Sequence, residues 1–231
     1  MSTHERGAAM VEAVIVLPVL LFLIFAIIEV GGTLRSYSGT ASAVRNGGRT
    51  ASLAAADSMA DAQILTKVAR HADSMGRDEV QFVVIWHATG PGDPVPAACL
   101  PASYTAPNSA SVGDAGTGPN AMGACSVYLA PSMPGGAFAM ADGNAVEPAA
   151  YYFGCAGPSD PDAWHKLDCN WPPTSRQVLT SPRGAANPHS TDFVGLYVQA
   201  RHDSYTGVLG SGFTITDQSI TLIEPQGYEL S

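Results

Sequence analysis

The chain has 231 residues, a length that suits one domain or at most two. Apolar residues make up 46% of the sequence but charged residues only 13%, about half of what an ordinary soluble domain carries. The formal net charge of -9 argues against nucleic acid as a partner, because contacts with a phosphate backbone need clustered lysines and arginines.

The apolar surplus is concentrated in residues 8–28, where nineteen of twenty-one residues are apolar and only Glu12 and Pro18 interrupt the run. As a helix this segment would reach about 30 Å, the thickness of the hydrocarbon core of a bilayer. A cleaved secretory signal is the alternative, but its apolar region should be about 7 to 15 residues long and end at a small-x-small site. No such site is evident after Ile28, so we expect a retained transmembrane helix.

Two features of the sequence predict opposite orientations for this helix in the membrane. Only Arg6 precedes the apolar run, whereas Arg35, Arg45 and Arg49 follow it, against the positive-inside tendency. Residues 78–231 carry four basic and fourteen acidic side chains, and all four cysteines lie there. Because cysteines without a C-x-x-C pair suit disulfides in an oxidising compartment, we expect the C-terminal part to be extracytoplasmic.

Glu12 requires an explanation, because a carboxylate within a spanning helix is costly and by default marks a function. Cleavage after Gly7 would make Ala8 the new N-terminus and Glu12 the fifth residue of the shortened chain. Pro18 removes one backbone hydrogen bond and can kink the helix. The alternative is an ordinary signal anchor, in which Glu12 lies near the cytoplasmic interface and Gly7 has no role.

Residues 29–76 are predicted to form a helical stem. Small and apolar residues spaced 4, 3, 4, 3, 4 and 3 apart predict one face of a continuing helix: Val30, Leu34, Tyr37, Ala41, Val44, Gly48 and Ala51. Such a face is more often core within the chain than a contact between subunits. The Asn-Gly-Gly sequence at 46–48 predicts a break, and Asp57 and Ser58 offer an N-cap for a second amphipathic helix ending at Gly76.

The rest of the chain, residues 77–231, predicts a small antiparallel sheet. Residues 80–87 alternate in strand fashion and are rich in β-branched side chains. Two further strands are predicted at 193–202 and 213–223, and the connection between them contains three glycines, which favours a hairpin. The predicted fold class is therefore α+β, with a long N-terminal transmembrane and stem helix followed by a β-rich domain.

Residues 89–190 are predicted to be a loop-rich insertion in this domain, because they hold most of the prolines and show no apolar period. Sequential disulfides, Cys99 with Cys125 and Cys155 with Cys169, are the simplest of three connectivities. Closing a loop of about 15 residues would gain about 3 kcal/mol in the chain-entropy picture. Five aromatic residues near the second pair suggest either a small core or a ligand surface: Tyr151, Tyr152, Phe153, Trp164 and Trp171.

The sequence contains no strong catalytic motif, so we predict neither an enzyme nor a bound cofactor. The weak candidates for calcium binding are Asp160, Asp162, His165 and Asp168. They lack the glycine and the final Glu of an EF-hand loop, and a solvated acidic loop is the alternative. His202, Asp203 and Ser204 have the composition of a hydrolase triad, but neighbours along a strand point to opposite faces, so we expect only a strand end.

The region around Gly7, with Ala8 and Glu12, resembles the signal of type IV prepilins. Together with the small-residue run at 41–52 and the strand-like end at 220–225, it resembles the TadE-type pseudopilins of tight-adherence (Tad, or Flp) pili. The resemblance covers residues 7–55 and 193–225, while the middle third matches no family pattern.

This resemblance implies that residues 1–7 are a leader removed by a prepilin peptidase, and that Glu12 and Pro18 serve subunit assembly. Glu12 would pair with the N-terminal amine of a neighbouring subunit, which fixes register because buried charges must be correctly placed. The implied function is a minor pilin or pseudopilin that initiates, caps or regulates a Tad pilus. Its implied partners are other pilins or pseudopilins, the pilus assembly platform, the peptidase and the membrane. A membrane-anchored, adhesin-like binding module and a tethered enzyme are the alternatives.

Overall fold

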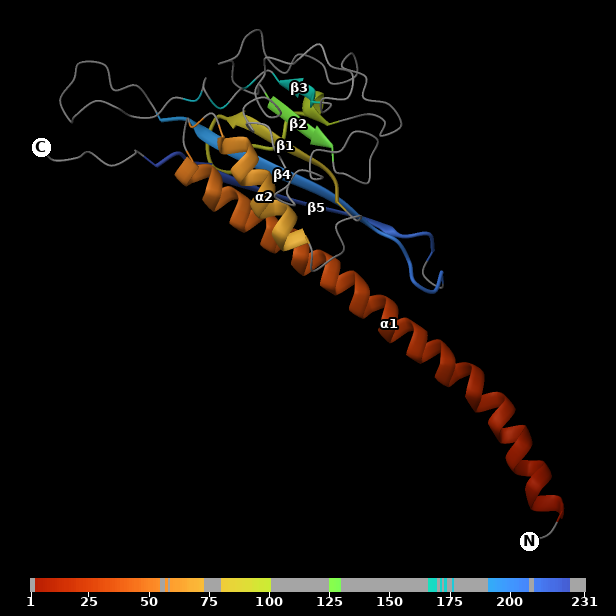
Figure 1. Ribbon diagram of the computed structural model, residues 1–231. Coiled ribbons are helices and arrows are strands. Elements are labelled where there is room, and N and C mark those ends of the chain that lie inside the picture. The colour runs from red at the N-terminus through yellow and green to blue at the C-terminus, as the bar shows by residue number, and fades with distance from the viewer. Residues whose placement is uncertain are drawn as a thin grey trace, which may run out of the picture.

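The computed structural model describes residues 3–54, 57, 59–72, 80–100, 125–129, 166–169, 171, 173, 176, 191–207 and 210–224. A long helix, α1, extends away from a head in which a shorter helix, α2, and a five-stranded antiparallel sheet lie together (Figure 1). The C-terminal half of α1 packs on the sheet, and its N-terminal half projects beyond it. The predicted α+β class is confirmed.

Helix α1 runs without interruption from Thr3 to Ala54 and contains Pro18. The predicted break at residues 46–48 is therefore wrong. Polar side chains here bond back one turn without breaking the helix: Asn46 Nδ2 donates to the Ser42 carbonyl at 2.8 Å, and Thr50 Oγ1 donates to the Asn46 carbonyl at 3.0 Å. Both Gly47 and Gly48 are buried against neighbouring elements, so tertiary packing overrides their low helix propensity.

Helix α1 and strand β5 (Phe213–Leu222) lie side by side and are joined by hydrogen bonds. These bonds recur every two residues along the strand and every four residues along the helix. Ser219 Oγ donates to the Val44 carbonyl at 3.3 Å, and Thr221 Oγ1 donates to the Gly48 carbonyl at 3.1 Å. Four helical residues rise about 6 Å and two strand residues rise about 6.6 Å. Alternate side chains on one face of β5 therefore meet successive turns of α1.

The same contact ends at Ser52, whose hydroxyl donates to the Leu222 carbonyl at 2.6 Å. The Glu224 amide donates to the Ser52 carbonyl at 2.9 Å. A Cβ on Gly48 would lie 2.4 Å from Ser219 Oγ, so a larger residue there would displace the hydroxyl that donates to the Val44 carbonyl. The predicted apolar face of the stem is buried only in this half, at Ala41, Val44, Gly48 and Ala51, while Val30, Leu34 and Tyr37 are exposed.

Helix α2 (Ala60–Ala72) begins close to the predicted cap. Asp57 Oδ1 accepts a hydrogen bond from the Met59 amide at 2.9 Å. The buried face of α2 includes Ile64, Leu65, Val68 and Ala69. The predicted helix end at Gly76 lies outside the described residues.

The sheet has the order β3-β2-β1-β4-β5, and every neighbouring pair is antiparallel. Besides β5 the strands are β1 (Val80–Ala88), β2 (Cys125–Leu129), β3 (Lys166–Cys169) and β4 (Phe193–His202). The predicted β4–β5 hairpin is confirmed, with His202 opposite Phe213 at its end. Strands β2 and β3 lie in the segment that was predicted to be loops. The prediction missed them because four or five residues are too few to show a periodic pattern.

Both faces of the sheet are covered. On the helix side the core joins α1, α2 and β4 through residues such as Val44, Ile64 and Leu196. On the other side Phe82, Val84 and Trp86 pack with the disulfide Cys99–Cys125, whose predicted pairing is confirmed. The pairing of Cys155 with Cys169 cannot be followed, since Cys155 lies outside the described residues.

Candidate membrane-insertion and assembly site

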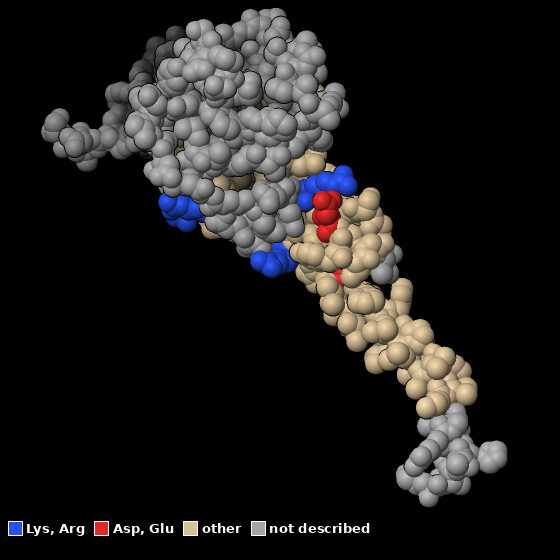
Figure 2. All heavy atoms as spheres, turned by 45° about the vertical axis from the view of Figure 1, so that its right-hand side comes forward, with Lys and Arg blue, Asp and Glu red and all other residues tan. Residues whose placement is uncertain are grey.

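The N-terminal half of α1 is an apolar surface without cover. Every large apolar side chain from Met10 to Ile28 is exposed, from 41% at Phe25 to 74% at Met10. Within the described residues, α1 is the one helix long and apolar enough to cross a membrane. In Figure 2 the described lower part of this helix is tan, and the visible charged side chains lie higher on the molecule.

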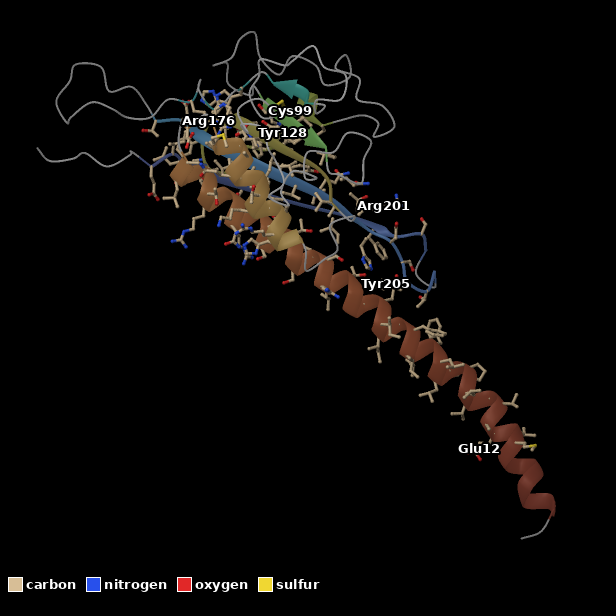
Figure 3. All side chains as sticks on the ribbon, in the orientation of Figure 1. Glu12, Cys99, Tyr128, Arg176, Arg201 and Tyr205 are labelled. Atoms are coloured by element: carbon tan, nitrogen blue, oxygen red, sulfur yellow. A yellow bond between two sulfur atoms is a disulfide. The ribbon has the colours of Figure 1, made fainter. Side chains whose placement is uncertain are left out.

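The residues predicted to serve processing and assembly all lie in this half of α1. Gly7 and Ala8 belong to its first turns, and Glu12 is exposed near the far end of the helix (Figure 3). Pro18 lies inside the helix and leaves the Val14 carbonyl without its usual donor. Their roles in cleavage and subunit pairing stay predictions.

Where the exposed half ends, Glu29 is fully buried although it follows the apolar run directly. Glu29 Oε2 accepts hydrogen bonds from the Tyr205 amide at 3.1 Å, and from the Thr206 amide and hydroxyl at 3.2 Å each. These donors belong to the loop between β4 and β5. The hydrogen bond from the Ser204 hydroxyl, with those from Thr206 and Tyr205, lowers the pKa of Glu29 against the opposing effect of desolvation.

The same loop and His202, the last residue of β4, contact α1 over two further turns. A Cβ on Gly32 would lie 2.4 Å from Tyr205 Cε2, so only glycine admits the ring at this distance. His202 Nδ1 lies 3.1 Å from Ser36 Oγ, and the His202 ring meets the Tyr205 ring edge to face at 5.1 Å. The β4–β5 loop therefore holds α1 where the helix leaves the head.

Residues 7–49, which include the exposed apolar half and this junction, match the model of the TadE-like protein family. This stretch of the chain is similar to the TadE-like family. This match confirms the resemblance that the sequence suggested over residues 7–49, and it indicates a pilin-like protein associated with a Tad pilus, in a family of pilus structural components. The apolar N-terminal helix fits a single-pass membrane anchor. No curated protein and no solved structure matches the chain.

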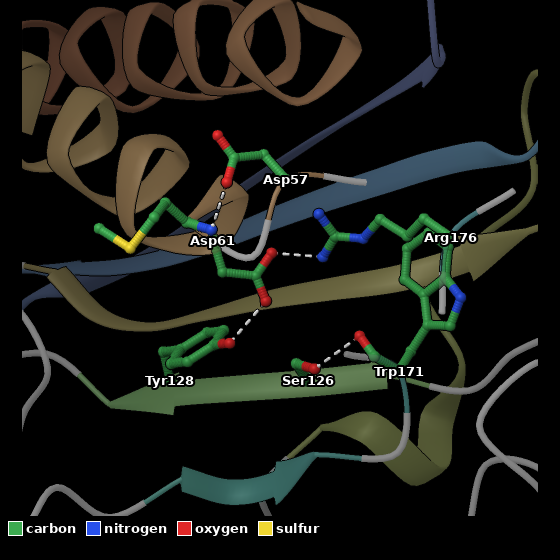
Figure 4. Close-up of polar contacts among 7 residues, drawn as sticks. Asp57, Asp61, Ser126, Tyr128, Trp171 and Arg176 are labelled. Atoms are coloured by element: carbon green, nitrogen blue, oxygen red, sulfur yellow. Dashed lines mark hydrogen bonds and ion pairs between the residues drawn. The ribbon is translucent and has the colours of Figure 1, made fainter. Parts of the chain in front are cut away.

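The head contains a buried polar cluster, which the sequence did not reveal (Figure 4). Asp61 on α2 forms an ion pair with Arg176, and the side chains of both are fully buried. The Tyr128 hydroxyl on β2 donates to Asp61 Oδ2 at 2.6 Å. Burial and the negative charge of Asp61 raise the pKa of Tyr128 well above its usual value, so its hydroxyl stays protonated.

Trp171 completes this cluster. The Arg176 guanidinium lies 4.7 Å from the centre of the Trp171 ring, and the His87 ring stacks on the Trp171 ring with 5.0 Å between the ring centroids. Ser126 Oγ donates to the Trp171 carbonyl at 3.1 Å. These buried contacts attach the part of the insertion around Trp171 and Arg176 to α2 and β2. Trp171 is therefore a core residue, which was one of the two alternatives; the other was a ligand surface.

The remaining candidates from the sequence do not form a described site. Among the described residues, no group of three or more His, Cys, Asp and Glu could hold a metal ion. Asp160, Asp162 and His165 lie outside the described residues, and of Asp168 only the backbone in β3 is described. His202 ends β4 as expected and faces Ser36, whereas Asp203 is exposed and pairs with Arg201, so no hydrolase triad exists here.

Sequence reasoning missed the Glu29 junction, although one signal was present. A carboxylate placed directly after an apolar run faces the membrane boundary unless another part of the protein satisfies it. The backbone donors to Glu29 Oε2 lie more than 170 residues further along the chain. No local pattern connects them.

Proposed function

We propose that this chain is a minor pilin or pseudopilin that initiates, caps or regulates a Tad pilus. Its role is structural rather than catalytic. The supporting observation is the division of α1 into an exposed apolar half and a half packed on the sheet, with the TadE-like match spanning both. An apolar surface of this extent marks contact with a membrane or with other proteins, and a filament core offers the same protection as lipid.

In this proposal the head lies outside the cytoplasm. The Cys99–Cys125 disulfide supports this location, since such bonds persist in oxidising compartments. The partners are other pilins or pseudopilins, the assembly platform, and a prepilin peptidase that cuts between Gly7 and Ala8. Glu12, exposed in the isolated chain, would pair in the filament with the amine of Ala8 on a neighbouring subunit.

The first experiment tests processing. In protein purified from its native membrane, N-terminal sequencing should find Ala8 at the start of the wild-type chain. In Gly7→Val the leader should remain attached, because the peptidase would meet a branched side chain at the cut. Gly31→Val is the matched control, since a Cβ at Gly31 meets nothing within 4 Å. Efficient maturation of Gly7→Val would count against the pilin assignment and in favour of a plain anchor.

The second experiment tests assembly. Glu12→Gln should insert into the membrane at least as well as the wild type, because a neutral amide is cheaper in lipid than a carboxylate. Its incorporation into pili should fall, because the charge that fixes subunit register is lost. Glu224→Gln, which alters an exposed carboxylate on the head, is the control. Pilus counts and recovery of pilus components decide the matter, and normal values for Glu12→Gln would contradict the role of Glu12.

A further inference from the structure

The loop between β4 and β5 lies at a defined level along α1. Its amides bind Glu29 and its Tyr205 ring rests on Gly32, so it is fixed directly beyond Ile28, where the apolar run ends. Residues 8–28 span about 30 Å as a helix, which equals the hydrocarbon core. The four residues after Ile28, up to Gly32, add about 6 Å, which reaches the headgroup layer. Figures 1 and 3 show the end of the hairpin and Tyr205 beside α1, with the rest of the helix extending past them.

The chemistry of this loop suits the boundary between lipid and water. From Ser204 to Phe213 the sequence contains no charged residue. Tyr205 is 61% exposed and Phe213 is 39% exposed, and the one charged residue of the loop, Asp203 at its start, is paired with Arg201 of β4. Tyrosine and other amphipathic aromatic side chains gather at membrane interfaces, where the ring meets acyl chains and the hydroxyl meets water.

We infer that the β4–β5 loop is a second membrane contact, which rests on the bilayer surface and sets how deeply α1 inserts. The inference rests on the proposed insertion of residues 8–28. The loop cannot avoid the surface if those residues span the bilayer, because its hydrogen bonds to Glu29 hold it at the boundary. Those bonds also cover a carboxylate that would otherwise face lipid at the same depth.

The test measures the depth of one position in the loop. The full-length chain carries a single added cysteine at Ser211, an exposed loop residue, labelled with a polarity-sensitive fluorophore under non-reducing conditions. The protein is reconstituted into vesicles of phosphatidylcholine and phosphatidylglycerol. Matched labels stand at Val19, in the middle of the apolar run, and at Leu53, which is 52% exposed at the far end of α1. The unsubstituted chain controls for background labelling.

The depth of each label is read from how strongly its fluorescence is quenched by nitroxides at different depths in the bilayer and by iodide in the water. We expect the Ser211 label to be quenched most by lipid with a nitroxide near the headgroup, and the Val19 label by lipid with a nitroxide deep in the acyl chain. Aqueous iodide should quench the Leu53 label several-fold more than the Ser211 label. Iodide quenching at Ser211 equal to that at Leu53 would overturn the inference while leaving insertion of α1 intact. Iodide quenching at Val19 would overturn both.

A variant separates lipid contact from contact with a second copy of the chain. In Tyr205→Ser combined with Phe213→Ser, iodide quenching at Ser211 should rise several-fold, while the Val19 label should not change. Protection of Ser211 from iodide without quenching by any lipid nitroxide would mean that protein covers the loop. That outcome would overturn the inference.

Discussion

The two halves of α1 differ in composition as sharply as they differ in surroundings. From Met10 to Ile28 the helix carries large apolar side chains, all exposed in the isolated chain. From Glu29 to Ala54 it carries mainly small residues, and the alanines, glycines and serines on one side are buried against α2, β4 and β5. Large side chains serve contact with lipid or with other helices, whereas small ones let a sheet approach the helix backbone closely. One continuous helix therefore serves two environments.

The difference between the two halves of α1 is tested most directly by placing the same charged residue in each half. Val44→Asp buries an unpaired carboxylate at a side chain that is 1% exposed, and it should lower the free energy of unfolding of the head by more than about 4 kcal/mol. Val16→Asp, at a side chain 54% exposed, should leave the head stable and cost about 3 kcal/mol in membrane insertion. Denaturant unfolding followed by tryptophan fluorescence, and membrane fractionation, measure the two effects. A stable head in Val44→Asp would refute the division.

A second test concerns what holds α2 beside the packed half. Arg176→Met leaves Asp61 buried without its cation and should reduce the free energy of unfolding by about 3–5 kcal/mol. Arg201→Met breaks an ion pair whose side chains are 48% and 77% exposed, and should cost at most about 1 kcal/mol. Both are compared by denaturant titration. Equal small losses would show that the buried cluster contributes no more than a surface pair.

Two glycines of α1 allow a matched test of close approach. Gly47→Val should destabilise the head by about 1–3 kcal/mol, because a Cβ there would lie 2.5 Å from Leu196 Cδ2 and 2.8 Å from Val68 Cγ2. Gly31→Val places the same side chain in open space and should stay within about 0.5 kcal/mol of the wild type. Thermal melting of the two variants side by side gives the difference. A tolerated valine at position 47 would show that the packing there adjusts freely.

The smallest expected effect is at Glu29, where the two halves meet. Its pKa is lowered in the folded protein, so its contacts stabilise the fold above the ordinary glutamate pKa and this contribution is lost as pH falls through the lowered value. The melting temperature of the wild type should exceed that of Glu29→Gln at neutral pH, and the two should converge in strong acid. A difference that grows on acidification would contradict the assignment.

The sequence could predict those features that depend on residues close together in the chain, but not those that depend on contacts between distant segments. The β4–β5 hairpin was predictable because ten-residue strands with a glycine-rich connection are visible over a short stretch. The helix through Gly47 and Gly48 was not, because β5 and α2 decide its continuity and both come later in the chain. Strand β3 is only four residues long, and Asp61 meets Arg176 across 115 residues, so neither leaves a periodic trace.

The unbroken course of α1 has a mechanical consequence. A pull along the exposed half reaches the head through an elastic rod with no hinge at Gly47 and Gly48. There it meets the hydrogen bonds at the carbonyls of Val44, Gly48 and Ser52, which lie in line along β5. Because the strand lies along the helix, tension loads these bonds in shear, all at once, rather than opening them one after another as in a zipper. Detachment of the head from α1 should therefore need a high rupture force.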